Sequence, residues 1–265
     1  MTAIQAAPPI ESLEITLASL QAEVKADPAN AGLRFRFAET LLLTGAYERA
    51  DVHLDLVSTQ DPSLGLRVAL IRQLIRAQLC RNEVFTQGRA PEVIGDAAPE
   101  VTVALKILLE QHNGQEAARL RSEADGAAVE IKGEVDDRPF SGLRDLDDRT
   151  ADILEVLTST GKYFWIPLRQ VRALDLHEPS HVRELIWRPA TLDVAGGPEG
   201  LVYIPSTYPP AGQPLDDDHR LGRKTDWFEL NGLTVGAGLR SWLVGDDVLS
   251  MTEFKSLATA PEAVA

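Results

Sequence analysis

The chain has 265 residues, a formal net charge of −14 and a single cysteine. Its length suffices for one large domain or two medium ones, each with its own hydrophobic core. The acidic charge, without any lysine-rich or arginine-rich block, argues against a nucleic-acid partner, and one cysteine excludes an internal disulfide.

The N-terminus, with Pro8 and Pro9, lacks the basic start and the apolar core of a secretion signal. No apolar run in the sequence is long enough to cross a membrane. We therefore expect a cytoplasmic protein.

The first third of the chain predicts a helical hairpin. Asp27-Pro28 and Asp61-Pro62 stand 34 residues apart, which is the period of a tetratricopeptide repeat. Between them, Ala38 and Ala50 are small residues at positions where two antiparallel helices must approach closely, and Thr44-Gly45-Ala46 interrupts the helical pattern at the turn. An ordinary helical bundle in which this spacing occurs once is the alternative.

Two further helical units follow, less regular than the first, one from Gly65 and one near Pro99. The residues expected to be buried are Val68, Ile71 and Ile75 in the second unit and Leu105, Leu109 and Ala118 in the third. Beyond Gly133 the composition shifts to Pro, Gly, Trp and Tyr with short apolar runs, which is typical of strands. We therefore predict an α+β protein, with a helical repeat domain at 1–130 and a mixed, mainly antiparallel β-rich domain at 131–265.

The second half opens with an aspartate-rich segment. We expect residues 151–160 to form an amphipathic helix, capped by Asp147 or Asp148, with Arg144 as a counter-charge. A metal site is the less favoured alternative, because the segment lacks the ligand spacing of a calcium loop. Two aromatic and β-branched runs, 163–167 and 201–205, each end in proline and predict strands that lie at a sheet edge or end at a corner.

The segment His177-Glu178-Pro179-Ser180-His181 matches the H-E-x-x-H string of zinc proteases. That motif needs an unbroken helix through both histidines, and Pro179 prevents it. A strand, a turn and a short helix fit the surrounding residues better. A zinc-dependent hydrolase that uses His177 and His181 is therefore a minor alternative, and we expect no cofactor.

Aromatic and arginine residues are dense in the second half. We expect Trp165, Trp187, Trp227 and Trp242 to build the core of the β-rich region. Arginines beside them can stack on rings and pair with carboxylates, so they serve either as structural pins or as interface anchors.

The chain resembles the ImpE/TagJ (SciE-type) accessory proteins of bacterial type VI secretion systems. In the first half the resemblance rests on Phe37-Ala38-Glu39, Gly45 to Ala50 and Asp61-Pro62. In the second half it rests on Arg144-Asp145-Leu146-Asp147-Asp148, Leu154-Glu155-Val156, Trp165-Ile166-Pro167, Leu185 to Ala190, Tyr203-Ile204-Pro205 and Leu221-Gly222-Arg223 through Asp226-Trp227. The second set is the more specific one.

The resemblance implies a non-enzymatic adapter with two partners: the small sheath subunit, bound by its N-terminal helix, and the AAA+ ATPase that recycles the contracted sheath. A structural subunit of the apparatus without a peptide groove is the alternative. The motif residues expected to be structural or to lie at an interface are Arg144, Asp145, Asp147, Asp148, Trp165, Pro167, Trp187, Arg188, Arg223, Asp226, Trp227 and Arg240.

A short helical-repeat domain can take a guest helix in its concave face. The repeat register predicts the lining as Phe35, Glu39 and Leu42 from the first unit and Ala69, Gln73 and Arg76 from the second. These residues could instead pack on the preceding helix, which we expect at 10–25.

Overall fold

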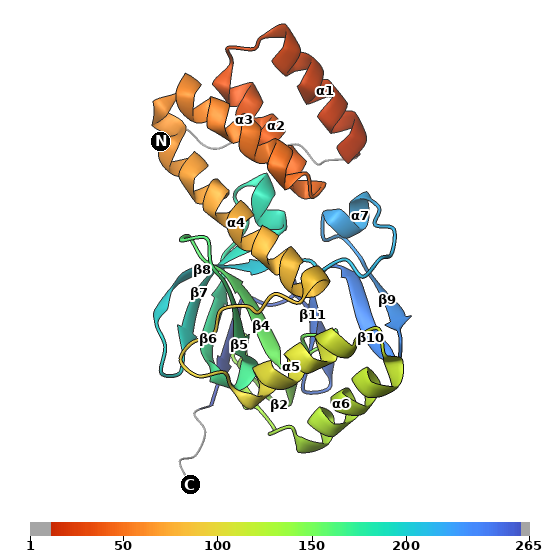
Figure 1. The fold of residues 1–265 in the computed structure, drawn as a ribbon. Helices are drawn as coiled ribbons and strands as arrows, with labels where there is room; N and C mark the ends of the chain where they lie inside the picture. Colours follow the sequence, from red (N-terminus) through yellow and green to blue (C-terminus); the bar gives the residue numbers. More distant parts are fainter. Residues whose placement is uncertain (1–11, 261–265) are drawn as a thin grey trace.

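The structure is a computed structural model that describes residues 12–260. Helices dominate its first half and strands its second (Figure 1). The α-helices are α1 (Leu13–Ala26), α2 (Ala31–Leu43), α3 (Tyr47–Gln60), α4 (Gly65–Gln87), α5 (Pro99–Glu110), α6 (Gly114–Ala127) and α7 (Asp217–Arg220). None of these described helices is long and apolar enough to span a membrane. The N-terminal segment interpreted above as lacking a secretion signal lies outside the described residues.

The predicted hairpin forms as α2 and α3. Ala38 and Ala50 are fully buried at their contact, and Gly45 takes the left-handed backbone angle that the turn requires (φ 77°). The next unit differs from a repeat, because α4 is one continuous helix of 23 residues. It buries Val68, Ile71 and Ile75 as expected.

The third unit forms the hairpin of α5 and α6, and its buried face was predicted only in part, because Leu105 and Ala118 are partly buried. Leu109 is 65% exposed, and the helix buries Val101, Ala104, Ile107 and Leu108 instead. The buried face follows the i, i+3, i+6 and i+7 spacing counted from Val101, so Leu109 falls on the solvent side.

Within residues 12–260 the strands form three sheets. They are β1 (Lys132–Val135), β2 (Arg138–Ser141), β3 (Leu143–Asp145), β4 (Ile153–Leu157), β5 (Tyr163–Pro167), β6 (Val171–Leu176), β7 (Trp187–Val194), β8 (Glu199–Pro205), β9 (Thr225–Leu230), β10 (Leu233–Gly238), β11 (Ser241–Val244), β12 (Asp247–Ser250) and β13 (Ser256–Thr259). The large sheet is antiparallel with the order β2-β1-β13-β6-β7-β8-β4-β5, and β12-β11-β3 and β10-β9 form two smaller sheets. The α+β class is confirmed.

Both proline-ended runs are strands, but only one lies at an edge. β5 is the last strand of the large sheet, as predicted, whereas β8 lies between β7 and β4. The predicted helix at 151–160 is wrong, because these residues contain β4, which is buried along its whole length. A strand covered on both faces shows no alternation, so its short apolar run could not be distinguished from a helical one.

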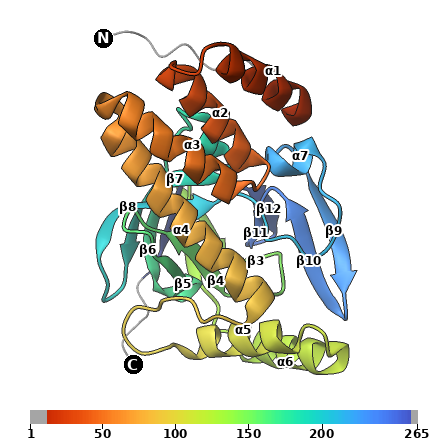
Figure 2. The same ribbon diagram turned by 45° about the horizontal axis from the view of Figure 1, so that its top comes forward.

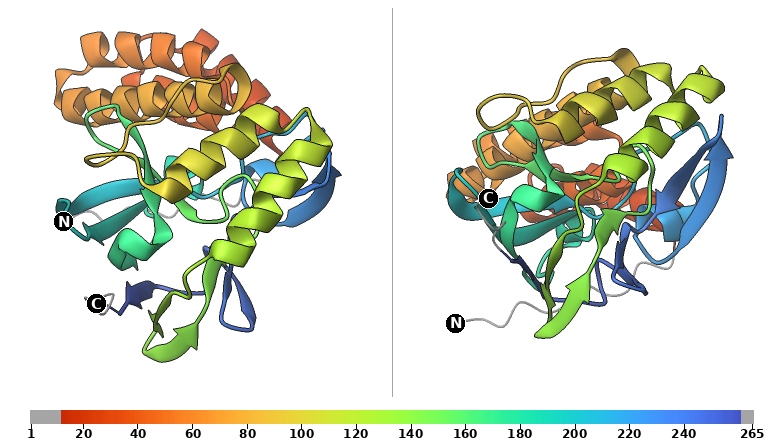
Figure 3. Two further views of the ribbon diagram at one scale, coloured as in Figure 1. Left: turned by 60° about the horizontal axis from the view of Figure 1, so that its bottom comes forward. Right: turned by 90° about the horizontal axis from the view of Figure 1, so that it is seen from below.

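The helices cover one face of the large sheet. The long helix α4 runs from the α2–α3 hairpin across this face (Figures 1 and 2). Alternate residues of β4 divide between two cores: Ile153 and Leu157 pack with the helices, and Leu154 and Val156 pack with the opposite core. The α5–α6 hairpin lies across the sheets from β4 and β5 to β10 (Figure 3). One face of the large sheet therefore shares a hydrophobic core with the helices, and the opposite face belongs to a second core.

Three of the four tryptophans lie in these cores. Trp165, Trp187 and Trp242 are at most 2% exposed, whereas Trp227 on β9 is 40% exposed. The prediction was wrong for Trp227 because β9 belongs to a two-stranded sheet and has no fully buried residue. Its ring packs edge-on against Tyr208.

Candidate functional site

A buried charge lies at the centre of the junction between helices and sheet. Glu155 points from β4 toward α4, where Arg81 donates two hydrogen bonds to its carboxylate, from Nε to Oε1 (2.7 Å) and from Nη2 to Oε2 (2.9 Å). Tyr163 donates to Oε1 of the same carboxylate, and the indole Nε1 of Trp165 lies 2.5 Å from the Tyr163 hydroxyl. Arg81 therefore joins α4 to the sheet through a pair from which water is excluded.

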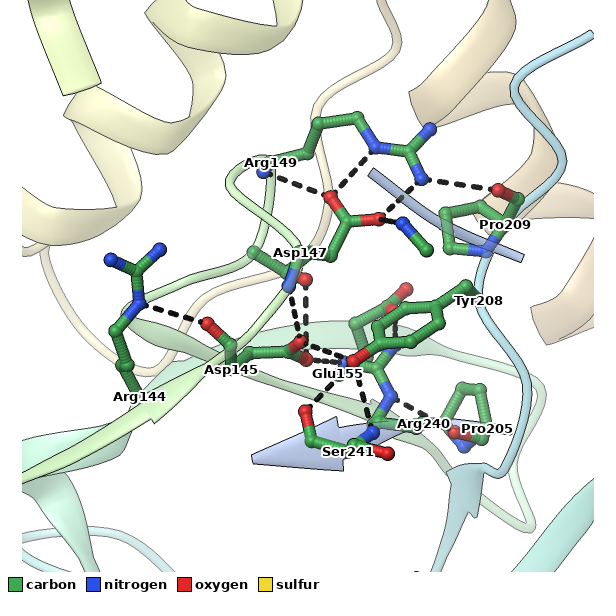
Figure 4. Close-up of polar contacts among 12 residues, drawn as sticks. Arg144, Asp145, Asp147, Arg149, Glu155, Pro205, Tyr208, Pro209, Arg240 and Ser241 are labelled. Atoms are coloured by element: carbon green, nitrogen blue, oxygen red, sulfur yellow. Dashed lines mark hydrogen bonds and ion pairs between the residues drawn. The ribbon is translucent and has the colours of Figure 1, made fainter. Parts of the chain in front are cut away.

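Arg240 extends this pair to a second carboxylate (Figure 4). Its guanidinium contacts both Glu155 and Asp145, and all three side chains are fully buried. Asp145 also accepts a hydrogen bond from the backbone of Asp147 (2.9 Å), and the Tyr208 hydroxyl lies 2.9 Å from its Oδ1. β3, β4 and the segment before β11 are thus fixed to one another.

A third pair completes the arrangement. Arg149 donates to both oxygens of Asp147, at 2.9 and 2.6 Å, and to the carbonyl oxygen of Pro209 at 3.2 Å. Asp147 also accepts from the backbone of Gly236 on β10 (3.0 Å). We call Arg81, Asp145, Asp147, Arg149, Glu155 and Arg240 the junction cluster; its three acidic and three basic side chains balance in charge.

The cluster shifts the acidity of its carboxyl groups in opposite directions. Burial alone would raise the pKa of Glu155, but Arg81 and Arg240 outweigh it and lower that pKa to about 2. Burial raises the pKa of Asp145 to about 6, against the opposing effect of Arg240 and with the help of the neighbouring Asp147 charge. Each carboxylate of this charge-balanced cluster is paired with an arginine, which fits a structural role.

Further contacts join α2 and α4 to the sheet. Arg183, in the short 3-10 helix Val182–Leu185, pairs with Glu39 of α2. Trp187 donates from its indole Nε1 to Gln78 of α4 (2.9 Å) and stacks on Tyr47, with ring centroids 6.2 Å apart. Among these residues, Glu39 was predicted to line the groove and Trp187 to be structural or to lie at an interface.

The remaining motif residues lie outside the junction cluster. Arg144 pairs with Asp148 (2.7 Å), and Asp226 lies 2.9 Å from His219. Arg223 lies 3.5 Å from Asp218, and Arg188 is buried 3.9 Å from Glu178. Pro167 is buried at the end of β5.

The structure separates the six predicted groove residues into two groups. Phe35, Glu39 and Leu42 are buried within the protein. Ala69, Gln73 and Arg76 line an open hollow of about 790 Å³ between α3 and α4. The two groups do not form one continuous surface.

The α3/α4 hollow has an apolar floor and a charged rim. Ile75, Leu79 and Cys80 form the floor. On the rim, Arg72 pairs with Asp51 (2.7 Å) and Asp55 (2.9 Å), and Arg89 pairs with Glu83 (2.5 Å). An amphipathic helix needs both kinds of surface, apolar for its anchors and charged for its flanks.

Comparisons with known proteins agree with this architecture. The model of the ImpE protein family matches residues 137–258. The type VI secretion system accessory component TagJ of Pseudomonas aeruginosa is 34% identical over 229 residues, which cover 86% of this chain and 81% of that protein. The chain belongs to the ImpE/TagJ family. A crystal structure of protein VPA1032 from Vibrio parahaemolyticus has a TM-score of 0.87, with 29% identity and 94% of each chain covered.

The part of this ImpE/TagJ chain matched by the family model contains all of the junction cluster except Arg81. Sequence reasoning selected Asp145, Asp147 and Arg240 as structural or interface residues. It assigned no such role to Arg81, Arg149 or Glu155, although Glu155 is part of a motif that carries the resemblance. Two signals were present: Glu155 is the only charge in the apolar run of β4, and Arg81 falls on the buried face of α4, seven residues after Leu74.

The two histidines of the H-E-x-x-H string have separate surroundings in this family member. His177 contacts Thr191 through Nε2 (3.0 Å), and His181 contacts Arg67 (3.4 Å). A strand, an irregular segment and a short 3-10 helix follow one another as predicted, but Pro179 lies before the helix Val182–Leu185 and not in its first turn. Within residues 12–260, no group of three or more His, Cys, Asp or Glu side chains is arranged to hold a metal.

Proposed function

We propose that this protein is a non-enzymatic adapter of a type VI secretion system that works in the cytoplasm. It binds the N-terminal helix of the small contractile-sheath subunit and links it to the AAA+ ATPase that recycles the sheath. Membership of a family that contains a named accessory component of this system supports the general role.

The observation that carries the binding step is the α3/α4 hollow. Its floor of Ile75, Leu79 and Cys80 offers apolar contacts to residues spaced i, i+3, i+4 and i+7 on a guest helix. Ala69 leaves space at the rim, and Arg76 has no ion-pair partner among residues 12–260. An acidic side chain of the guest helix would form an ion pair with Arg76.

A labelled peptide of the sheath subunit's N-terminal helix tests this proposal by fluorescence anisotropy. Ala69→Trp fills the rim of the hollow, and we expect it to weaken binding by about tenfold or more, the effect of losing roughly 1.4 kcal/mol of contact. Ala18→Trp, at an exposed position of α1, is the matched control and should bind like the wild type.

Two results would contradict parts of the proposal. If Ala69→Trp and the wild type bind the peptide with equal affinity, the α3/α4 hollow is not the binding site. If the wild type does not bind the peptide, the sheath helix is not the partner. Capture of the purified ATPase by the protein, with and without saturating peptide, tests the linking step separately.

A further inference from the structure

A second hollow, of about 380 Å³, opens where the end of α1 meets α2 and α3. It is lined by Gln21, Val24, Lys25, Pro28, Arg34, Phe37, Arg49 and His53. Four of these residues are basic and none is acidic. We call it the Arg34 hollow; in a protein with a net charge of −14, a lining with basic residues and no acidic residue needs an explanation.

Arg34 lies at its base with only 9% of its surface exposed. Its guanidinium donates to the side-chain oxygen of Gln60 (3.1 Å) and to the carbonyl oxygen of Pro28 (2.8 Å), and contacts Nδ1 of His53 (3.3 Å). All three partners are neutral groups. A buried guanidinium without a counter-charge is costly, and the buried arginines of the junction cluster each have a carboxylate.

The other two cations of the hollow are also unpaired. Lys25 and Arg49 make no ion pair with any residue in the described range 12–260, in contrast to Arg72, which holds two aspartates across the α3–α4 contact. Both side chains are exposed and can move toward a ligand.

His53 adds a hydrogen-bond donor of fixed orientation. Because an arginine only donates, Nδ1 of His53 accepts from Arg34, which places the ring proton on Nε2. Phe37 packs edge-on against the ring at 4.8 Å and holds it in place. Burial, Arg34 and Arg49 lower the pKa of His53, which favours the neutral ring at pH 7.

We propose that the Arg34 hollow binds an oxyanion, a phosphate or a carboxylate group. Arg34 and Arg49 offer the planar donor geometry that such groups accept, Lys25 adds a point charge, and Val24 and Phe37 supply an apolar wall for the body of the ligand. The proposal concerns a surface separate from the α3/α4 hollow and does not depend on the adapter function.

A phosphate titration, followed by the NMR signals of the His53 ring, tests whether the Arg34 hollow binds an oxyanion. Inorganic phosphate replaces chloride at constant ionic strength, so that general screening does not change. The wild type should show a saturable shift and a rise in the pKa of His53, because a bound anion favours the charged ring. Lys25→Gln with Arg49→Gln should weaken binding by about tenfold or more, since two charge-assisted contacts are lost.

Arg36→Gln with Lys106→Gln is the matched control, because both side chains are exposed and the change in net charge is the same. A non-saturating wild-type response, or equal weakening in the control, would overturn the proposal. A parallel titration with glutamate blocked at both termini distinguishes the sources of the ligand. Saturation by phosphate alone identifies a phosphate ligand, and saturation by the blocked glutamate identifies a carboxylate from a protein.

Discussion

The junction cluster and the α3/α4 hollow use the same residue types under different conditions. In the cluster, Arg81, Arg240 and Glu155 are at most 3% exposed, and each charge depends on its neighbours. In the hollow, Arg72 is 40% exposed and its two aspartates are 36% and 64% exposed. Water can replace any partner in the hollow but none in the cluster. Burial, rather than the presence of an ion pair, therefore separates residues that maintain the fold from residues free to bind a partner.

The largest effect should follow a change inside the cluster. Glu155→Gln keeps the shape of the side chain but leaves Arg81 and Arg240 with one carboxylate fewer. We expect the free energy of unfolding to fall by about 3 to 5 kcal/mol, measured by urea denaturation. Glu178→Gln, at a side chain that is 73% exposed, is the control and should stay within about 0.5 kcal/mol of the wild type. If Glu155→Gln lowers the free energy of unfolding no more than the control does, the buried cluster does not stabilise the fold more than exposed charges do.

A smaller effect should come from the pH dependence of Asp145. Its pKa is raised to about 6 in the folded protein, so between its usual value near 4 and pH 6 the folded state binds a proton that the unfolded state has released. Stability from this group therefore falls as the pH rises through that interval, by up to about 3 kcal/mol. Urea denaturation from pH 4 to pH 7 should show that slope in the wild type and lose it in Asp145→Asn. Parallel pH profiles of the two proteins would contradict the assignment.

The smallest effect belongs to the rim of the hollow. Arg72→Gln removes both exposed ion pairs of α3 and α4, yet it should cost less than about 1 kcal/mol, because solvent screens such pairs. The same denaturation measurement checks it, and adding 1 M salt to the wild type should reproduce most of the change. A loss as large as that of Glu155→Gln would show that this rim also maintains the fold.

Local patterns in the sequence predicted several elements well. Small residues and a glycine turn located the α2–α3 hairpin, and an aromatic run ended by proline located β5 and its edge position. The patterns failed where an element is covered on both sides. β4 was taken for a helix because both of its faces are buried. β8 was expected to lie at a sheet edge or to end at a corner, and it lies between β7 and β4.

The candidate sites were harder to predict. The sequence singled out Asp145 and Asp147, but Asp147 was expected to cap a helix where the structure has β4. Asp147 pairs instead with Arg149, and Asp145 pairs with Arg240, which lies 95 residues away in the chain. For the groove, the repeat register placed Phe35, Glu39 and Leu42 on a concave face that the protein's own 3-10 helix covers through Arg183. Spacing along one helix carries no information about a distant segment that packs on it.

The sequence by itself determined a helical first half and a strand-rich second half, the excess of acidic residues and the membership of a family, because propensity, periodicity and composition act over short stretches of chain. Only the tertiary structure decided which charges are buried together and which remain open to a partner. Burial depends on segments from both halves meeting in one core, and the free energy of an ion pair depends on that burial far more than on which residues form it.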